Sequence, residues 1–103
     1  MTRQEIVDLY FEGDEALYAD YAEACQRQFK ADVDEGDEAL SRGDHQAMRR
    51  LAHALKSVLE TLGRREYTAW ASALEAAALT QEPRAMQSAW HPLRAALLQP
   101  WHP

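Results

Sequence analysis

Two glycine-aspartate pairs, Gly13-Asp14 and Gly43-Asp44, divide this chain into segments with helical spacing. Glycine readily adopts the left-handed backbone that ends a helix, and an aspartate side chain accepts hydrogen bonds from the free N–H groups that begin the next one. Each pair therefore predicts a helix end followed at once by a helix start. β-branched residues are scarce, and no segment sustains the apolar-polar alternation of a strand. The sequence predicts an all-α fold.

The first pair separates a short helix from a long one. Thr2 and Glu5 have the spacing of a capping box at the start of the segment that Gly13 ends. The segment after Asp14 has apolar residues at helical spacing over many turns. Gly36 lies inside this pattern, and glycine weakens a helix interior, so we expect a break or a bend between residues 29 and 37.

Three more helices are predicted after the second pair. The first runs from about Asp44 to Leu62 and ends at Gly63, and a turn over residues 80 to 83 separates the other two. Pro92 lies inside the last helix and should kink it, because proline has no backbone N–H to donate. Short connections make successive helices antiparallel. The prediction is an antiparallel up-down four-helix bundle with a short extra N-terminal helix.

The chain has 103 residues, the size of one domain. We expect a single helical bundle domain over residues 1–103, with a loose tail from about residue 99. No run approaches the roughly 18 apolar residues of a membrane span, and the N-terminus lacks the apolar centre of a signal peptide. These features predict a cytoplasmic protein without membrane contact, and Met1 with a complete bundle favours a free-standing chain.

The charge distribution limits the possible partners. A net charge of −6 argues against a nucleic-acid-binding protein, which needs a basic face to meet phosphates. A single cysteine, Cys25, excludes an internal disulfide, and we expect it to act as a small buried apolar residue. The cations are unevenly placed, and five of the eleven lie on or just after the third predicted helix, at Arg49, Arg50, Lys56, Arg64 and Arg65.

His53 lies on the polar side of that third helix. At about 100° per residue, one face carries Met48, Leu51, Leu55, Val58, Leu59 and Leu62. The opposite face carries Gln46, Arg49, Arg50, His53, Lys56, Ser57 and Glu60. A histidine on the solvent side among cations is placed to carry or meet an anion, and phosphate is the obvious candidate.

A histidine that accepts a phosphoryl group needs a free ring nitrogen, an acceptor that holds the other N–H, and a nearby cation. Lys56 can supply the cation. His53 lies ten residues before Gly63 and Glu75 twelve after it, so an antiparallel pair of helices brings them to similar heights. Glu75 is therefore the predicted acceptor that fixes the tautomer.

Other chemistry is less well supported by the sequence. His45 follows a predicted cap, His91 precedes a proline and His102 lies in the tail. Because no two histidines have the i, i+4 spacing of a helical zinc site, we expect no metal site. A nucleophilic hydrolase would need a serine or cysteine oriented by a histidine and an oxyanion hole at strand-to-helix turns, which an all-helical chain lacks.

The His53 segment resembles the histidine-containing phosphotransfer (HPt) domain of multistep two-component relays. That family has a histidine, a lysine three residues later, a small residue next, and a leucine-glycine pair at the ninth and tenth positions. Here these residues are His53, Lys56, Ser57, Leu62 and Gly63. The resemblance extends over nearly the whole chain, through the glycine-aspartate pairs and the helix after Gly63.

The resemblance implies a phosphorelay carrier without kinase activity. His53 would take a phosphoryl group from the aspartate of a hybrid sensor kinase's receiver domain and pass it to the receiver of a response regulator. It implies a monomer with no cofactor of its own, since the receiver brings Mg²⁺. An acidic receiver pocket needs positive charge opposite it, so the expected docking face comprises Arg49, Arg50, Ser57 and Glu60 around His53.

Two positions depart from the family pattern. Ser57 stands where glycine is most common, and Glu60 occupies a position where a small neutral residue is common. Glu60 could pair with Lys56 and compete for its charge, although such an exposed pair contributes only about 0.3–0.5 kcal/mol. These departures leave two alternatives open. One is an HPt-like module that binds a receiver or kinase without transfer, and the other is an unrelated helical adaptor with an extended apolar surface stripe.

Overall fold

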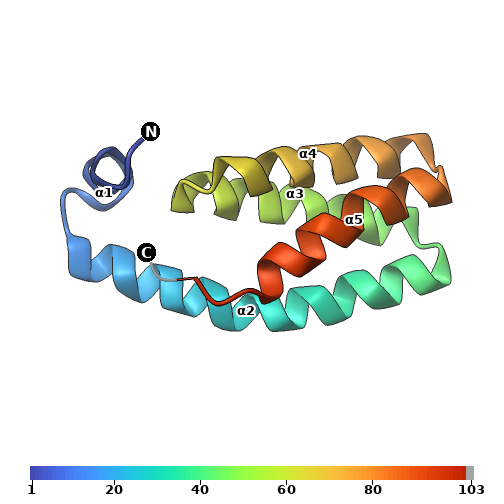
Figure 1. Cartoon of the computed structure of the whole chain (residues 1–103), viewed down its shortest axis with the longest axis horizontal. Helices are drawn as coiled ribbons and strands as arrows, with labels where there is room; N and C mark the ends of the chain where they lie inside the picture. Colours follow the sequence, from blue (N-terminus) through green and yellow to red (C-terminus); the bar gives the residue numbers. More distant parts are fainter. Residues whose placement is uncertain (102–103) are drawn as a thin grey trace.

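The computed structural model describes residues 1–101 and contains five α-helices (Figure 1). They are α1 (Arg3–Phe11), α2 (Glu15–Arg42), α3 (His45–Leu62), α4 (Arg65–Thr80) and α5 (Pro83–Leu98). Helices α2 to α5 pack lengthwise as a four-helix bundle, and α1 lies at the end of the bundle where α2 begins (Figure 1). No strand occurs within the described residues. The predicted all-α bundle with an extra N-terminal helix is confirmed.

The predicted caps determine where the helices begin and end. The side chains of Asp14 and Asp44 each accept a hydrogen bond at 3.0 Å, from the backbone N–H groups of Leu17 and Ala47. Gly43 ends α2 with φ 65°, in the left-handed region that glycine adopts without strain. These local interactions place α3 antiparallel to α2.

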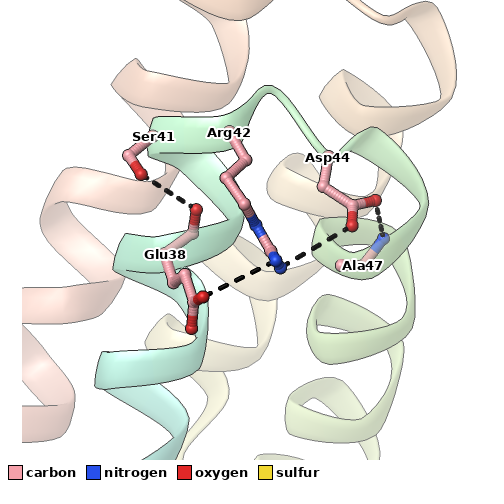
Figure 2. A network of polar contacts seen from close by, with 5 residues as sticks. All are labelled: Glu38, Ser41, Arg42, Asp44 and Ala47. Carbon is pink, nitrogen blue, oxygen red and sulfur yellow. Dashed lines mark hydrogen bonds and ion pairs between the residues drawn. The ribbon is translucent and has the colours of Figure 1, made fainter.

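A polar network reinforces the corner between α2 and α3 (Figure 2). The Arg42 guanidinium lies 3.5 Å from the Glu38 carboxylate and 3.9 Å from that of Asp44. Ser41 Oγ donates to the Glu38 carbonyl oxygen at 3.1 Å, and Asp44 caps the N–H of Ala47. Arg42 therefore ties the last turn of α2 to the cap of α3. Because the charges are exposed, their contribution to stability is small.

The core runs along the inside of the bundle. In α3 the buried side chains include five of the predicted apolar positions, Met48, Leu51, Leu55, Leu59 and Leu62. Val58 is partly buried and packs against the same core. The Tyr18 hydroxyl donates to the Leu62 carbonyl oxygen at 3.1 Å, which ties α2 to the end of α3. The predicted helical face therefore packs inward and leaves His53 on the outer side.

The predicted break in the long helix does not occur, and the alternative of a bend stays a prediction. Helix α2 continues without a break from Glu15 to Arg42, and Gly36 is buried within it. A Cβ atom at Gly36 would lie 2.3 Å from two ring carbons of Trp90 in α5. Glycine is present here because the indole ring occupies the space where a side chain would begin. The cost of glycine in a helix interior is offset by this close packing.

Helix α5 contains both of the prolines that mark the last segment. Pro83 occupies its first turn, where no helical N–H bond is lost. The helix continues past Pro92 to Leu98, although proline leaves one carbonyl of the preceding turn without its donor. The expected kink at Pro92 stays a prediction.

The start of the tail differs from the expected loose segment. Trp101 is half-buried, its ring lies under the Arg64 guanidinium at 4.6 Å, and its carbonyl oxygen accepts a hydrogen bond from Gln26. These contacts hold residue 101 against the bundle because the indole covers part of the core. Residues 102 and 103 lie outside the described part of the chain, and with them His102.

None of the described helices has the combination of length and apolar character that crossing a membrane requires.

Candidate functional site

His53 lies near the middle of α3 on its exposed side, and its side chain is 70% exposed. Its Nδ1 atom lies 2.8 Å from Oε2 of Glu75 on α4, a distance typical of a strong hydrogen bond. The Glu75 side chain is only 21% exposed, because α3 and α4 pack along most of their length. The antiparallel arrangement brings the two residues together across the Gly63 turn.

This contact makes the two ring nitrogens of His53 different. A carboxylate has no hydrogen to donate, so in a neutral imidazole bonded to Glu75 the hydrogen is on Nδ1. The lone pair of the ring is then on Nε2, which makes Nε2 the nucleophilic atom. The exposed ring is accessible to a partner, and the half-buried carboxylate is fixed in position beneath it.

A shallow hollow of about 400 Å³ adjoins His53. Its lining residues are Gln46, Arg49, Arg50, His53, Ala54 and Glu75. Neither arginine forms an ion pair with any residue in the range 1–101. Both guanidinium groups are exposed and remain available to an anion beside the imidazole.

Lys56 lies one turn after His53 and is half-buried, but it does not line this hollow. The anticipated pairing of Lys56 with Glu60 is absent from the ion pairs within residues 1–101. Glu60 is exposed and lines a separate hollow toward α1, with Tyr10 and Thr68 among its neighbours. The lysine charge is therefore not neutralised by the glutamate of its own helix.

Ser57 is exposed beside His53, and its side chain turns back toward its own helix. The Ser57 hydroxyl donates to the His53 carbonyl oxygen over a long 3.5 Å, and Thr61 Oγ1 donates to the Ser57 carbonyl oxygen at 3.0 Å. On the Ser57 side of the imidazole, the surface therefore carries only a small side chain.

The remaining candidate residues do not gather into a second site. His45 Nδ1 lies 3.4 Å from the Met86 sulfur at the α3–α5 contact, and Cys25 is half-buried against the core. Burial raises the pKa of the Cys25 thiol, which favours its unreactive protonated form. Within residues 1–101, no three His, Cys, Asp or Glu side chains are grouped so that they could hold a metal ion.

A model of the Hpt domain matches residues 17–99, a range that contains nearly all of α2 and the whole of α3, α4 and α5. The chain belongs to the Hpt domain family. Hpt domains are phosphotransfer carriers of phosphorelay signalling rather than kinases, and they interact with receiver domains. Comparisons with curated proteins and with solved structures gave no match. Helix α1 and Trp101 lie outside the matched range.

Sequence reasoning did not identify the hollow as a site. It placed Gln46 on the correct face of α3 but gave it no role, and it did not single out Ala54. Gln46 could have been found from the helical wheel, since it lies two turns before His53 on the same side. Ala54 gives no sequence signal, because an alanine in a helix is compatible with almost any environment.

Proposed function

We propose that this Hpt domain is a phosphorelay carrier in which His53 accepts a phosphoryl group from a receiver-domain aspartate and passes it to a second receiver. The observation that carries the proposal is the 2.8 Å contact between His53 Nδ1 and Glu75 Oε2, combined with a 70% exposed histidine side chain. A fixed tautomer and an accessible ring are what a nucleophilic imidazole needs. Phosphoryl transfer then depends on positioning and charge.

In the forward step, the Nε2 lone pair of His53 attacks the phosphorus of the aspartyl phosphate. An N–P bond forms, the P–O bond to the aspartate breaks, and the carboxylate leaves with the electron pair. The imidazole gains positive charge as the N–P bond forms, and the Glu75 carboxylate stabilises that charge through Nδ1–H. Transfer to the second receiver reverses the same bond changes, with its aspartate carboxylate as the nucleophile.

The surrounding cations support this step. The phosphoryl oxygens carry negative charge throughout, and Lys56 is placed one turn from the histidine to stabilise them. Arg49 and Arg50 extend the positive surface along α3 and would meet the acidic pocket of a receiver. Mg²⁺ is expected on the receiver, whose carboxylates hold it.

A module that binds a receiver without transfer would not require a nucleophilic histidine. The exposure of His53 and the lack of a Lys56–Glu60 pair within the described residues favour transfer over binding alone. An unrelated adaptor is ruled out by the family match.

The test is phosphotransfer from a radiolabelled receiver domain to the purified protein. We expect label on the wild type that is labile in acid and stable in alkali, and we expect none on His53→Gln. The variant should melt at the wild-type temperature, because an exposed side chain contributes little to packing. His91→Gln, at another exposed histidine, is the matched control and should retain full label. Label that persists on His53→Gln would contradict the assignment.

A further inference from the structure

A further pocket lies between α1 and the turn that joins α3 to α4. Its volume is about 210 Å³, and the residues that line it include Arg3, Ile6, Tyr18, Leu62, Arg64 and Trp101. We call it the Arg64 pocket. Arg3 and Ile6 belong to α1, which lies at this end of the bundle (Figure 1), and both they and Trp101 are outside the range that matches the Hpt domain. The pocket therefore depends on segments that the family match does not cover.

The Arg64 guanidinium is the main polar group of this pocket. Its central carbon lies 3.9 Å from the centroid of the Tyr67 ring and 4.6 Å from that of the Trp101 ring. Rings stacked on a guanidinium cover its face and leave the N–H groups at its edge as donors. Burial lowers the pKa of Arg64, but an arginine keeps its charge at neutral pH. Within residues 1–101 this half-buried cation forms no ion pair.

The other charges around the pocket are also mainly positive. The Arg3 guanidinium lies 3.7 Å from the Glu15 carboxylate, which neutralises part of its charge. Glu60 and Glu66 line two neighbouring hollows, and Arg65 lines both of them as well. Among the described residues, no aspartate or glutamate lines the Arg64 pocket itself. In a chain with a net charge of −6, this pocket is therefore suited to an anion.

We propose that the Arg64 pocket binds a small carboxylate ligand with a flat apolar body, such as an aromatic acid. The planar guanidinium can pair with a carboxylate through two parallel hydrogen bonds. Ile6, Leu62 and Trp101 provide apolar walls for the body of the ligand. The volume is below the roughly 300–1,000 Å³ of sites for drug-sized molecules, which limits the ligand to about one substituted ring.

The experiment follows the amide spectrum of the ¹⁵N-labelled protein while benzoate is added at constant ionic strength. We expect saturable shifts at the residues of the Arg64 pocket, with a dissociation constant in the millimolar range that is typical of so small a ligand. Benzyl alcohol keeps the ring without the charge, and inorganic phosphate keeps a charge without the ring. Each should bind about fivefold or more weakly than benzoate, because each loses one half of the proposed recognition.

Variants test the role of the guanidinium. Arg64→Gln should weaken benzoate binding about fivefold or more, because it removes the charged donors. Arg65→Gln, at the adjacent exposed arginine that does not line the pocket, is the matched control and should change binding by less than about twofold. Arg3→Gln should weaken binding about threefold, because it removes a cation and leaves Glu15 unpaired nearby. Melting curves verify folding, and Arg3→Gln decides the matter if Arg64→Gln does not fold.

Several results would overturn the assignment. They are the absence of saturable shifts, benzoate shifts confined to the hollow beside His53, equal affinity for benzyl alcohol or phosphate, and equal effects of Arg65→Gln and folded Arg64→Gln. The Arg64 pocket shares no lining residue with the hollow beside His53. Benzoate binding and phosphotransfer are therefore separate measurements, and either proposal can fail while the other stands.

Discussion

The hydrogen bond between His53 and Glu75 makes one histidine of this chain chemically distinct from the others described. His45 contacts a methionine sulfur, and His91 is exposed. Within residues 1–101, neither of them is hydrogen-bonded to a carboxylate. At His53 the carboxylate fixes the ring orientation and stabilises the charge that phosphorylation creates. The proposed chemistry therefore depends on two side chains from adjacent helices.

Ser57 tests whether a partner passes close to this ring. We expect Ser57→Tyr to block receiver docking and transfer, because a large side chain would project from the surface beside His53. Its stability should change by less than about 0.5 kcal/mol, since the position is exposed. The measurement is transfer kinetics together with a melting curve.

Ser57→Gly is the matched control for that prediction. It keeps the surface low, so docking should persist, at a cost of roughly 0.5–1 kcal/mol in helix stability. If Ser57→Tyr transfers as fast as the wild type, the partner approaches His53 from another side.

Between elements, the contact of α2 with α5 depends on a glycine and an indole ring. Gly36 provides the space for Trp90, whose Nε1 donates to Asp37 Oδ1 at 2.9 Å. Arg94 Nε donates to the same carboxylate at 2.9 Å and 3.0 Å. The two helices are thus joined by close packing and by a polar cluster one residue away.

Gly36→Ala should destabilise the fold although alanine is the better helix former. The new Cβ would lie 2.3 Å from the Trp90 ring, and overpacking of this kind costs about 1–3 kcal/mol, against about 1 kcal/mol gained in helix propensity. Chemical denaturation of the single variant should show a net loss of up to about 2 kcal/mol. In a Trp90→Leu background the same substitution should be neutral or stabilising, and a loss of equal size there would contradict the steric explanation.

The Asp37 cluster predicts a pH-dependent contribution to stability. The hydrogen bond from Arg94, aided by that from Trp90, lowers the pKa of Asp37 below its usual 3.8. A carboxyl group with a lowered folded-state pKa stabilises the fold above its unfolded-state pKa, and this stabilisation is lost as the pH falls through the folded-state value. Arg94→Gln should therefore melt below the wild type at pH 7, and the difference should shrink at pH values under 3.8.

Arg84→Gln, at an exposed arginine on the same helix, is the control and should melt like the wild type at both pH values. Because the Asp37–Arg94 pair is partly exposed, salt should also reduce the difference at pH 7. A difference that stays constant from pH 7 to pH 3 would show that Arg94 acts through packing alone.

Across the whole molecule, the sequence predicted the features that depend on neighbouring residues. It did not predict the contacts between residues that are far apart in the chain. Asp14 and Asp44 cap helices through residues three positions away, so the sequence alone indicated the helix starts. The break or bend expected near Gly36 did not account for Trp90, because this ring, which fills the space beside the glycine, comes from far along the chain. The packing of Trp101 on Arg64 was not predicted for the same reason, since these two residues are also far apart in the chain.

The candidate site also has a part that the sequence predicted and a part that it did not. The position of Glu75 opposite His53 followed from the antiparallel register across Gly63, and the structure contains that contact at 2.8 Å. The hollow beside it depends on how Arg49, Arg50 and Gln46 orient their long side chains, which helical periodicity does not specify. The roles assigned to these residues stay predictions.

The central claim is that phosphorylation forms an N–P bond at Nε2 of His53 while Nδ1–H stays bonded to Glu75. Nitrogen and phosphorus magnetic resonance of the ¹⁵N-labelled, phosphorylated protein tests it most directly, because coupling to ³¹P identifies the bonded ring nitrogen. We expect coupling at Nε2 of His53, a retained hydrogen on Nδ1, and loss of that hydrogen's protection from exchange in Glu75→Ala. Coupling at Nδ1, or phosphorus on any other residue, would contradict it.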